Sequence, residues 1–133
     1  MSSCSASTEY DENHVCEKTF DGNSGSYSWA TKGEGAGAWI QVNFDGLSRI
    51  TKVLVLPRGN PAADGMFKDI TLEFQDLSIA EFTLSNAYEW NEIELSGSHI
   101  STYVNITATS VYSQINNGFS ELKVFGCPAG TVP

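Results

Sequence analysis

The stretch Trp39-Ile40-Gln41-Val42-Asn43-Phe44 decides the fold class of this chain. Its apolar side chains alternate with Gln41 and Asn43, so one face of the segment is apolar and the other is polar. Alternation with a period of two is typical of a half-buried β-strand. Helical periodicity is nearly absent elsewhere in the chain, which favours an all-β domain.

Similar short segments recur after this stretch. They cover residues 49–56, 69–74, 79–84, 89–95, 102–108 and 121–125. Turn-forming clusters separate them, including Asp45-Gly46, Ser96-Gly97 and Asn116-Asn117-Gly118. Short strands joined by polar loops predict a β-sandwich or jelly roll with seven to eight antiparallel strands. We expect residues 2–28, which lack periodicity, to wrap the sandwich as irregular chain.

Length and composition limit the classes of function. A chain of 133 residues forms one domain, and its 41% apolar content is normal for a globular protein. Acidic residues outnumber Lys and Arg by 16 to 7, and the net charge of −9 disfavours nucleic acid and anionic membranes as partners. No segment has the ~20 apolar residues of a membrane helix, and none has the pattern of a signal peptide. The start Met1-Ser2-Ser3 is typical of an excised piece of a longer protein.

The chain contains three cysteines, Cys4, Cys16 and Cys127. Cys4 and Cys127 bracket almost the whole chain, and a bridge between them would stabilise the fold by about 4–5 kcal/mol through loop entropy. That bridge would indicate an oxidising compartment and would leave Cys16 as a small buried residue. The sequence also allows three alternatives, which are a Cys16–Cys127 bridge, a Cys4–Cys16 bridge and three free thiols. The sequon Asn105-Ile106-Thr107 is compatible with secretion.

Catalytic constellations are scarce, so we expect no enzyme. His14 and His99 lie far apart and outside zinc-ligand spacings, and the many serines are most simply solvated. The glycine-rich stretch 33–37 leads into a strand and not into a helix, so it lacks the helix N-terminus that holds a phosphate.

The cluster Phe20-Asp21-Gly22-Asn23-Ser24-Gly25-Ser26 is more informative. Such a loop can turn several carbonyl and carboxylate oxygens toward one point, which is the donor set that Ca²⁺ prefers. It lacks the full EF-hand spacing, so an ordinary turn is the alternative.

Taken in order, several motifs resemble the discoidin domains, also called coagulation factor five/eight type C domains. They are also similar to the family 32 carbohydrate-binding modules. The matching stretches are Thr19–Asn23, Trp29, Ala38–Phe44, Ile50–Val53, Lys68–Phe74, Tyr103–Ile106 and Glu121–Cys127. The resemblance spans residues 4–127 and leaves 128–133 as a linker.

This resemblance implies a galactose-binding-like jelly-roll sandwich with a structural calcium ion. The relatives often carry an end-to-end disulfide, which Cys4 and Cys127 fit, with Cys16 as a buried free thiol. The calcium ligands of the relatives fall here on Asp21, Asn23, Ser26 and Glu121. A Glu121 that only caps the loop by hydrogen bonds is the alternative.

The resemblance also places a ligand edge at the loops of one end. Arg58, Asp64 and Phe119 take the positions of a hydroxyl-binding arginine, its polar neighbour and a sugar-stacking aromatic. An ordinary Arg58–Asp64 ion pair is the alternative. Asn60 and Asn117, together with Tyr27 and Tyr112, are expected at the rim, whereas Trp29 and Trp39 are expected in the core. The histidine that galactose-binding relatives carry after the first Trp is missing, which puts galactose itself in doubt.

We therefore expect a secreted or cell-surface, non-catalytic module of a larger protein that binds a glycan or glycoprotein and serves in lectin-like recognition or adhesion. The alternative is a protein-recognition module that uses the same loops. A third reading, phospholipid binding through Met66 and Phe67, conflicts with the net charge of −9.

Overall fold

The computed structural model describes residues 3–22, 27–58, 66–112 and 116–129. These residues form seven strands and one 3-10 helix. The strands are β1 (Ser3–Ala6), β2 (Trp29–Ala30), β3 (Trp39–Pro57), β4 (Asp69–Glu73), β5 (Ile79–Thr83), β6 (Asn91–Ala108) and β7 (Gly118–Pro128), and the helix η1 covers Cys16–Phe20. Within these ranges, no helix has the length and apolar character needed to cross a bilayer.

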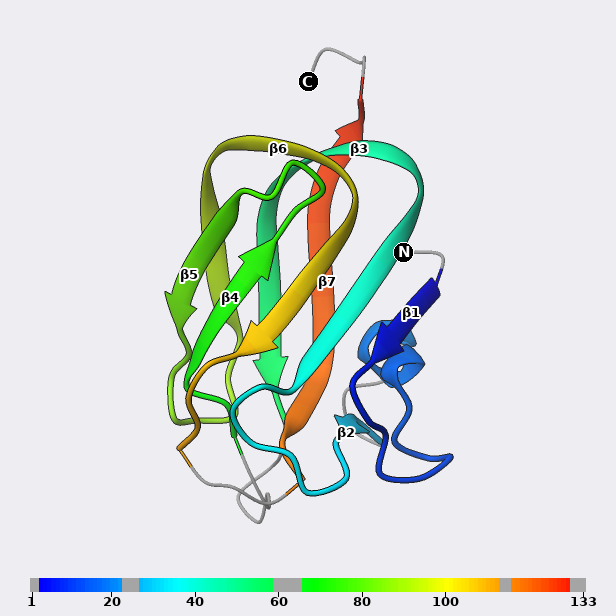
Figure 1. Ribbon diagram of the computed structural model, residues 1–133, viewed down its shortest axis with the longest axis vertical. Coiled ribbons are helices and arrows are strands. Elements are labelled where there is room, and N and C mark those ends of the chain that lie inside the picture. The colour runs from blue at the N-terminus through cyan, green and yellow to red at the C-terminus, as the bar shows by residue number, and fades with distance from the viewer. Residues whose placement is uncertain (1–2, 23–26, 59–65, 113–115, 130–133) are drawn as a thin grey trace.

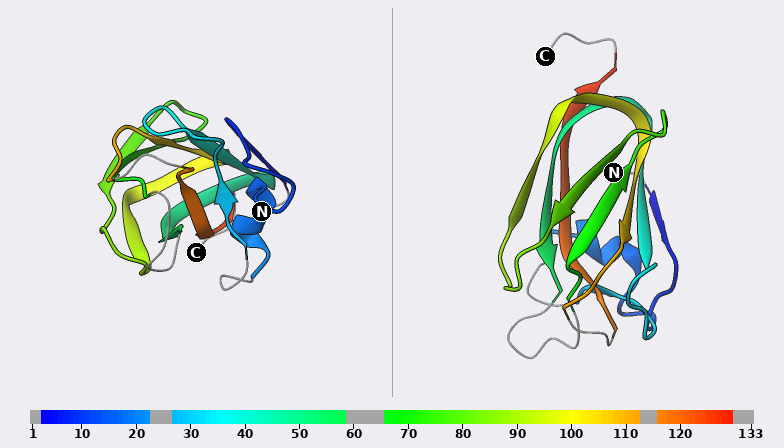
Figure 2. Two further views of the ribbon diagram at one scale, coloured as in Figure 1. Left: turned by 90° about the horizontal axis from the view of Figure 1, so that it is seen from below. Right: turned by 60° about the vertical axis from the view of Figure 1, so that its left-hand side comes forward.

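The strands form a jelly-roll-like sandwich because β3 and β6 are long and bent. Their first and second halves belong to different layers, as the arches at the upper end of Figure 1 and of the right-hand view in Figure 2 show. One layer has the order β2-β7-β3-β6, and the other has β1-β3-β6-β4-β5, all antiparallel. The predicted all-β sandwich with antiparallel strands and little helix is confirmed.

The bends fall where the sequence predicted turns between separate strands. The pairing of β3 with β6 shifts register between Asn43 and Ser48, around Asp45-Gly46, and Gly97 has φ 74° within β6. A second shift, between Ile50 and Lys52, inserts an extra residue in β3, so that both Ile50 and Val53 face the core. Asp45-Gly46 and Ser96-Gly97 are therefore corners inside continuous strands.

The core lies between the layers and follows the predicted alternation. Ile40, Val42, Val104 and Ile106 are buried, and Asn105 points outward, as predicted. Trp29 is fully buried, but Trp39 is only half-buried because the inward Ile40 leaves its neighbour on the outer face. The prediction of a core Trp39 is wrong. The largest buried side chains are Trp29, Phe67, Phe74 and Phe119.

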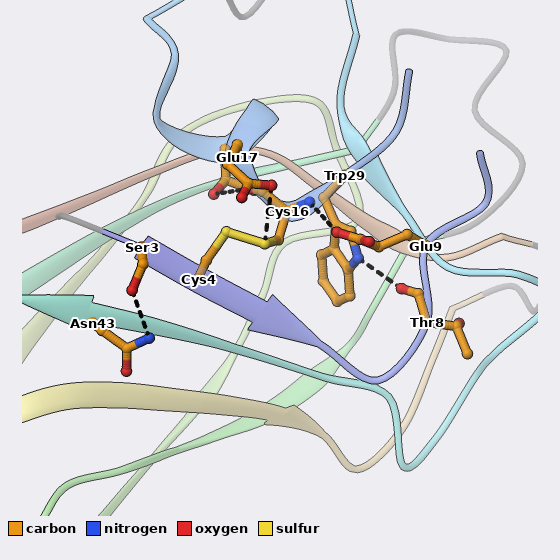
Figure 3. Close-up of a disulfide and its surroundings, with 9 residues drawn as sticks. Ser3, Cys4, Thr8, Glu9, Cys16, Glu17, Trp29 and Asn43 are labelled. Atoms are coloured by element: carbon orange, nitrogen blue, oxygen red, sulfur yellow. Dashed lines mark hydrogen bonds between the residues drawn. A yellow bond between two sulfur atoms is a disulfide. The ribbon is translucent and has the colours of Figure 1, made fainter. Parts of the chain in front are cut away.

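The disulfide joins Cys4 to Cys16 (Figure 3). Cys127 is a free cysteine. The predicted Cys4–Cys127 bridge with an unpaired Cys16 is wrong, although Cys16 is buried as expected. The pairing register explains the difference. Cys4 lies opposite Val42 in the first half of β3, whereas Cys127 lies opposite Arg49 beyond the bend. Helix η1 instead brings Cys16 beside β1, with a Cα–Cα distance of 6.1 Å.

Candidate functional site

The loops at the lower end of the sandwich gather segments that are distant in the sequence (Figure 1). The chain enters this end after β1 and again after β2, leaves it through the start of β3, and returns at the ends of β3 and β6 and at the start of β7. Hydrogen bonds tie these segments together. The hydroxyls of Ser7 and Thr8 both donate to Glu34 Oε1 at 2.6 Å, and Gly33 N donates to Asn116 Oδ1 at 3.0 Å. The loop end is therefore a preorganised surface.

A cluster of three aromatic rings forms the floor of this end. The ring centroids of Trp29, Phe67 and Phe119 lie 5.2–6.0 Å apart, and the Trp29 indole donates to Thr8 O at 3.0 Å. Only 1% of Phe119 is exposed, because its pairing with Trp29 in β2 turns the ring inward. The assignment of Phe119 as a sugar-stacking ring is wrong. Phe67 is likewise buried, so it cannot act as a membrane spike.

Arg58 lies at the end of β3 and is partly buried. Its Nε donates to Ser28 Oγ at 3.1 Å, which fixes the direction of the guanidinium group. Asp64 and Asn60, the other residues predicted around Arg58, lie outside the described residues. The predicted Arg58–Asp64 pair therefore stays a prediction.

Asn117 has a structural position and is not a rim residue. It is fully buried, its side-chain Nδ2 donates to Glu34 O at 3.0 Å, and its backbone carbonyl accepts a hydrogen bond from Thr31 N at 2.8 Å. Both contacts hold the loop before β7 against the loop after β2. Burial by these two loops removes Asn117 from any ligand, so its predicted role at the rim is wrong.

Tyr112 and Tyr27 are exposed tyrosines, as a rim role requires. The hydroxyl of Tyr112 donates to Leu84 O at 2.7 Å, and Lys68 Nζ lies 5.7 Å from the ring centroid. Tyr27 is 46% exposed and directly precedes Ser28, the partner of Arg58.

Tyr27 also belongs to a group of rings that the sequence did not single out. The His14 ring lies 5.6 Å, between centroids, from both Tyr10 and Tyr27, in edge-to-face contacts of 88° and 84°. Asp11 Oδ1 lies 2.6 Å from His14 Nδ1, and this hydrogen bond lowers the pKa of Asp11 below its ordinary value. Tyr10 and His14 lie in the aperiodic N-terminal segment, where neither strand nor helix spacing marks a face. Only the folded chain brings them to Tyr27.

Two acidic residues meet where η1 packs against β7. Asp21 follows η1 and is exposed, whereas Glu121 in β7 is only 4% exposed. Burial, followed by the hydrogen bond and charge of Asp21, raises the pKa of Glu121 to about 7. Glu121 Oε1 is buried and makes no hydrogen bond within the described part of the chain. Two facing carboxylates with an unsatisfied oxygen fit a hard cation such as Ca²⁺. The other two predicted ligands, Asn23 and Ser26, lie outside the described residues.

A second histidine cluster lies elsewhere, near β5. Ser78 Oγ donates to Asp76 Oδ1 at 2.5 Å and lies 2.8 Å from His99 Nδ1. In a nucleophilic triad the carboxylate orients the histidine and the histidine receives the serine proton. Here the carboxylate binds the serine, so this cluster does not have the arrangement of a triad.

The fold and its loop end define a galactose-binding-like β-sandwich domain. Similar solved structures include the family 32 carbohydrate-binding module CpGH89CBM32-5 from Clostridium perfringens, in complex with GalNAc-β-1,3-galactose. It has a TM-score of 0.79 and 20% identity, with 92% of this chain and 94% of that chain covered. The family 32 module of C. perfringens NanJ, in complex with galactose, has a TM-score of 0.78 and 18% identity, with coverages of 92% and 91%. The F5/8 type C domain of a Bacteroides fragilis protein has a TM-score of 0.76 and 14% identity, with coverages of 95% and 91%.

The fold expected from the resemblance is therefore confirmed. The family model described as "Domain of unknown function (DUF7402)" matches residues 1–125, and the chain belongs to this family. No curated protein sequence matches the chain at a significant level.

Proposed function

We propose that this domain is a non-catalytic carbohydrate-binding module that acts outside the cell and binds glycans or glycoproteins through its lower loops. The observation that carries this proposal is the hydrogen bond that fixes Arg58 on Ser28, the residue that directly follows the exposed Tyr27. The similar structures support it, because several of them are carbohydrate-binding modules. The Cys4–Cys16 disulfide supports an extracellular setting, since disulfides persist in oxidising compartments.

The chemistry of this pair suits a sugar. A guanidinium group presents several donors in one plane and can bind two neighbouring hydroxyls, while an aromatic ring covers the apolar face of a pyranose. Tyr27 takes the stacking role that Phe119 cannot perform. Because the surface is shallow and each neutral hydrogen bond contributes only ~0.5–1.5 kcal/mol, we expect weak binding by a single site.

A glycan array with the wild-type domain and an Arg58→Ala variant tests the proposal. We expect the wild type to bind at least one glycan and Arg58→Ala to lose that signal, while its melting temperature stays close to that of the wild type. Arg58→Lys keeps the charge but lacks the planar donor set, so it should recover little binding. Arg49→Ala, next to the bend of β3 at the opposite end of the sandwich, is the matched control. A wild type that binds no glycan, but binds a protein partner through the same loops, would contradict the proposal.

We further propose a structural calcium ion between η1 and β7, held by the carboxylates of Asp21 and Glu121 and by Asn23 and Ser26. The buried unsatisfied Oε1 of Glu121 supports this site. The ion would neutralise two facing carboxylates and would join two segments that are a hundred residues apart in the sequence. Calcium should raise the melting temperature of the chelator-treated protein, and Glu121→Gln should abolish that rise. A melting temperature that is the same in calcium and in chelator would contradict the site.

A further inference from the structure

We propose that Tyr10, His14 and Tyr27 form a second sugar-contacting surface next to Arg58, so that the module binds an oligosaccharide better than a single sugar unit. This inference rests on the proposed carbohydrate-binding function. It gives these three aromatic side chains a ligand, and it predicts that the domain prefers a glycan of two or more sugar units.

The three rings are in contact through His14, and the chain leads directly from the last of them to the residue that holds Arg58. Tyr10 and Tyr27 are each 46% exposed, and both contact His14. Tyr27 is covalently adjacent to Ser28, which holds Arg58. A single sugar on Arg58 could contact Tyr27, but reaching Tyr10 requires a ligand that extends past His14. A chain of two or more sugar units can contact both ends of this surface.

The segment that carries Tyr10 and His14 is held in place before any ligand binds. Tyr10 N donates to Ala30 O at 2.7 Å, and Ala30 N donates to His14 O at 3.3 Å. Cys16 N donates to Glu9 Oε2 at 2.7 Å, which closes the segment, and the Cys4–Cys16 disulfide anchors its end to β1 (Figure 3). Binding therefore orders few side chains, which lowers its entropic cost.

The polar groups of this surface suit sugar hydroxyls. Asp11 accepts the hydrogen bond from His14 Nδ1, and this contact leaves the Nε2 atom of His14 for a hydroxyl group of the ligand. Exposed rings beside such groups are the combination that a pyranose requires, with an apolar face and a polar edge.

Charge restricts the type of sugar. The same segment carries the exposed acidic residues Glu9, Asp11 and Glu12, within a domain of net charge −9. Lys18, whose Nζ lies 5.8 Å from the Tyr27 ring centroid, offsets only part of this negative charge. A glycan with carboxylates or sulfates would be repelled there, whereas an uncharged sugar or an amino sugar would not. We therefore expect neutral or amino-sugar chains as ligands.

Isothermal titration with two probe pairs tests the inference. The pairs are galactose with GalNAc-β-1,3-galactose, and glucosamine with chitotriose. In the pair that binds, the longer sugar should bind more tightly. Tyr10→Ala should weaken the affinity for the longer sugar by about 3- to 10-fold and leave the affinity for the single unit unchanged, as the loss of one aromatic contact predicts. Arg58→Ala should weaken both. Phe125→Ala removes a similarly exposed ring from β7 and should change neither.

The outcomes separate this inference from the proposed function. Equal binding of the short and long sugars, or full affinity in Tyr10→Ala and His14→Ala, would overturn the second surface while the carbohydrate-binding function stands. A wild type that binds no sugar in the titrations or on the glycan array would overturn both. Tyr10→Phe keeps the ring and should keep the preference for the longer sugar. If Tyr10→Ala fails to fold, the His14 imidazole resonances of the wild type decide, since they should shift with the longer sugar and not with the single unit.

Discussion

The substitution Glu121→Gln should make the calcium-free domain more stable at pH 8. Glu121 has a pKa of about 7 in the folded protein, against an ordinary value of 4.5. The folded state therefore holds a proton that the unfolded chain releases, and stability falls as the pH rises from about 4.5 to about 7. Glutamine resembles the protonated form at every pH, so the variant escapes this loss.

The size of the effect follows from the pKa. A shift from 4.5 to about 7 corresponds to about 3 kcal/mol at most, and solvent screening around the exposed Asp21 reduces this to about 2 kcal/mol. Asp11, Asp69 and Asp76 have lowered pKa values because they accept hydrogen bonds from His14, Thr83 and Ser78 respectively. Their contribution to stability is lost only on acidification below about pH 4, which lies outside the window from pH 5 to 8.

Urea denaturation in chelator at pH 5 and at pH 8 measures this prediction. The wild type should lose about 2 kcal/mol more than Glu121→Gln between these two pH values. Glu81→Gln, which changes an exposed carboxylate on β5, should behave as the wild type. The same pH dependence in Glu121→Gln and in the wild type would refute the reasoning. In saturating calcium the order of stability should reverse, because a ligand at 100 times its dissociation constant adds about 2.7 kcal/mol to the wild type alone.

Three further substitutions test the fold. Cys16→Ser removes a bridge that closes a loop with a sequence separation of 12, so the free energy of unfolding should fall by about 3 kcal/mol. A peptide map of the unreduced wild type should show Cys4 joined to Cys16 and not to Cys127. Phe119→Ala should lower the free energy of unfolding in urea by about 3–5 kcal/mol, because the ring is buried. An unchanged free energy of unfolding would contradict the packing of Phe119 against Trp29 and Phe67. Gly118→Ala would place a Cβ 1.9 Å from Trp29 O, so we expect a lower melting temperature and a free energy of unfolding that is about 1–3 kcal/mol smaller. A melting temperature equal to that of the wild type would contradict the close pairing of β2 and β7.

The strands could be predicted from the sequence because their period-two alternation records which face is buried. The long bent strands could not, since a corner such as Asp45-Gly46 has the same composition as a turn between strands. The disulfide was mispredicted for a related reason. Cysteine positions in the sequence do not show that β1 and β7 pair with different halves of β3.

The site was predictable only in part. The motif order singles out Arg58, and its role in binding stays a prediction; its contact with Ser28 is visible only in the folded chain. Phe119 was given the wrong face because no alternation marks the start of β7, where five consecutive residues are buried. Tyr10 and His14 lie in irregular chain, so only tertiary contacts show that their rings lie next to each other and to Tyr27.

The most direct test of the account is an NMR titration of the ¹⁵N-labelled domain with galactose, GalNAc-β-1,3-galactose and chitotriose. We expect the backbone amide shifts caused by the binding sugar to concentrate on Tyr27, Ser28 and Arg58, and we expect Arg58→Ala to abolish them. Shifts confined to the opposite end of the sandwich, around the corners of β3 and β6, or no shifts with any of the three sugars, would contradict it.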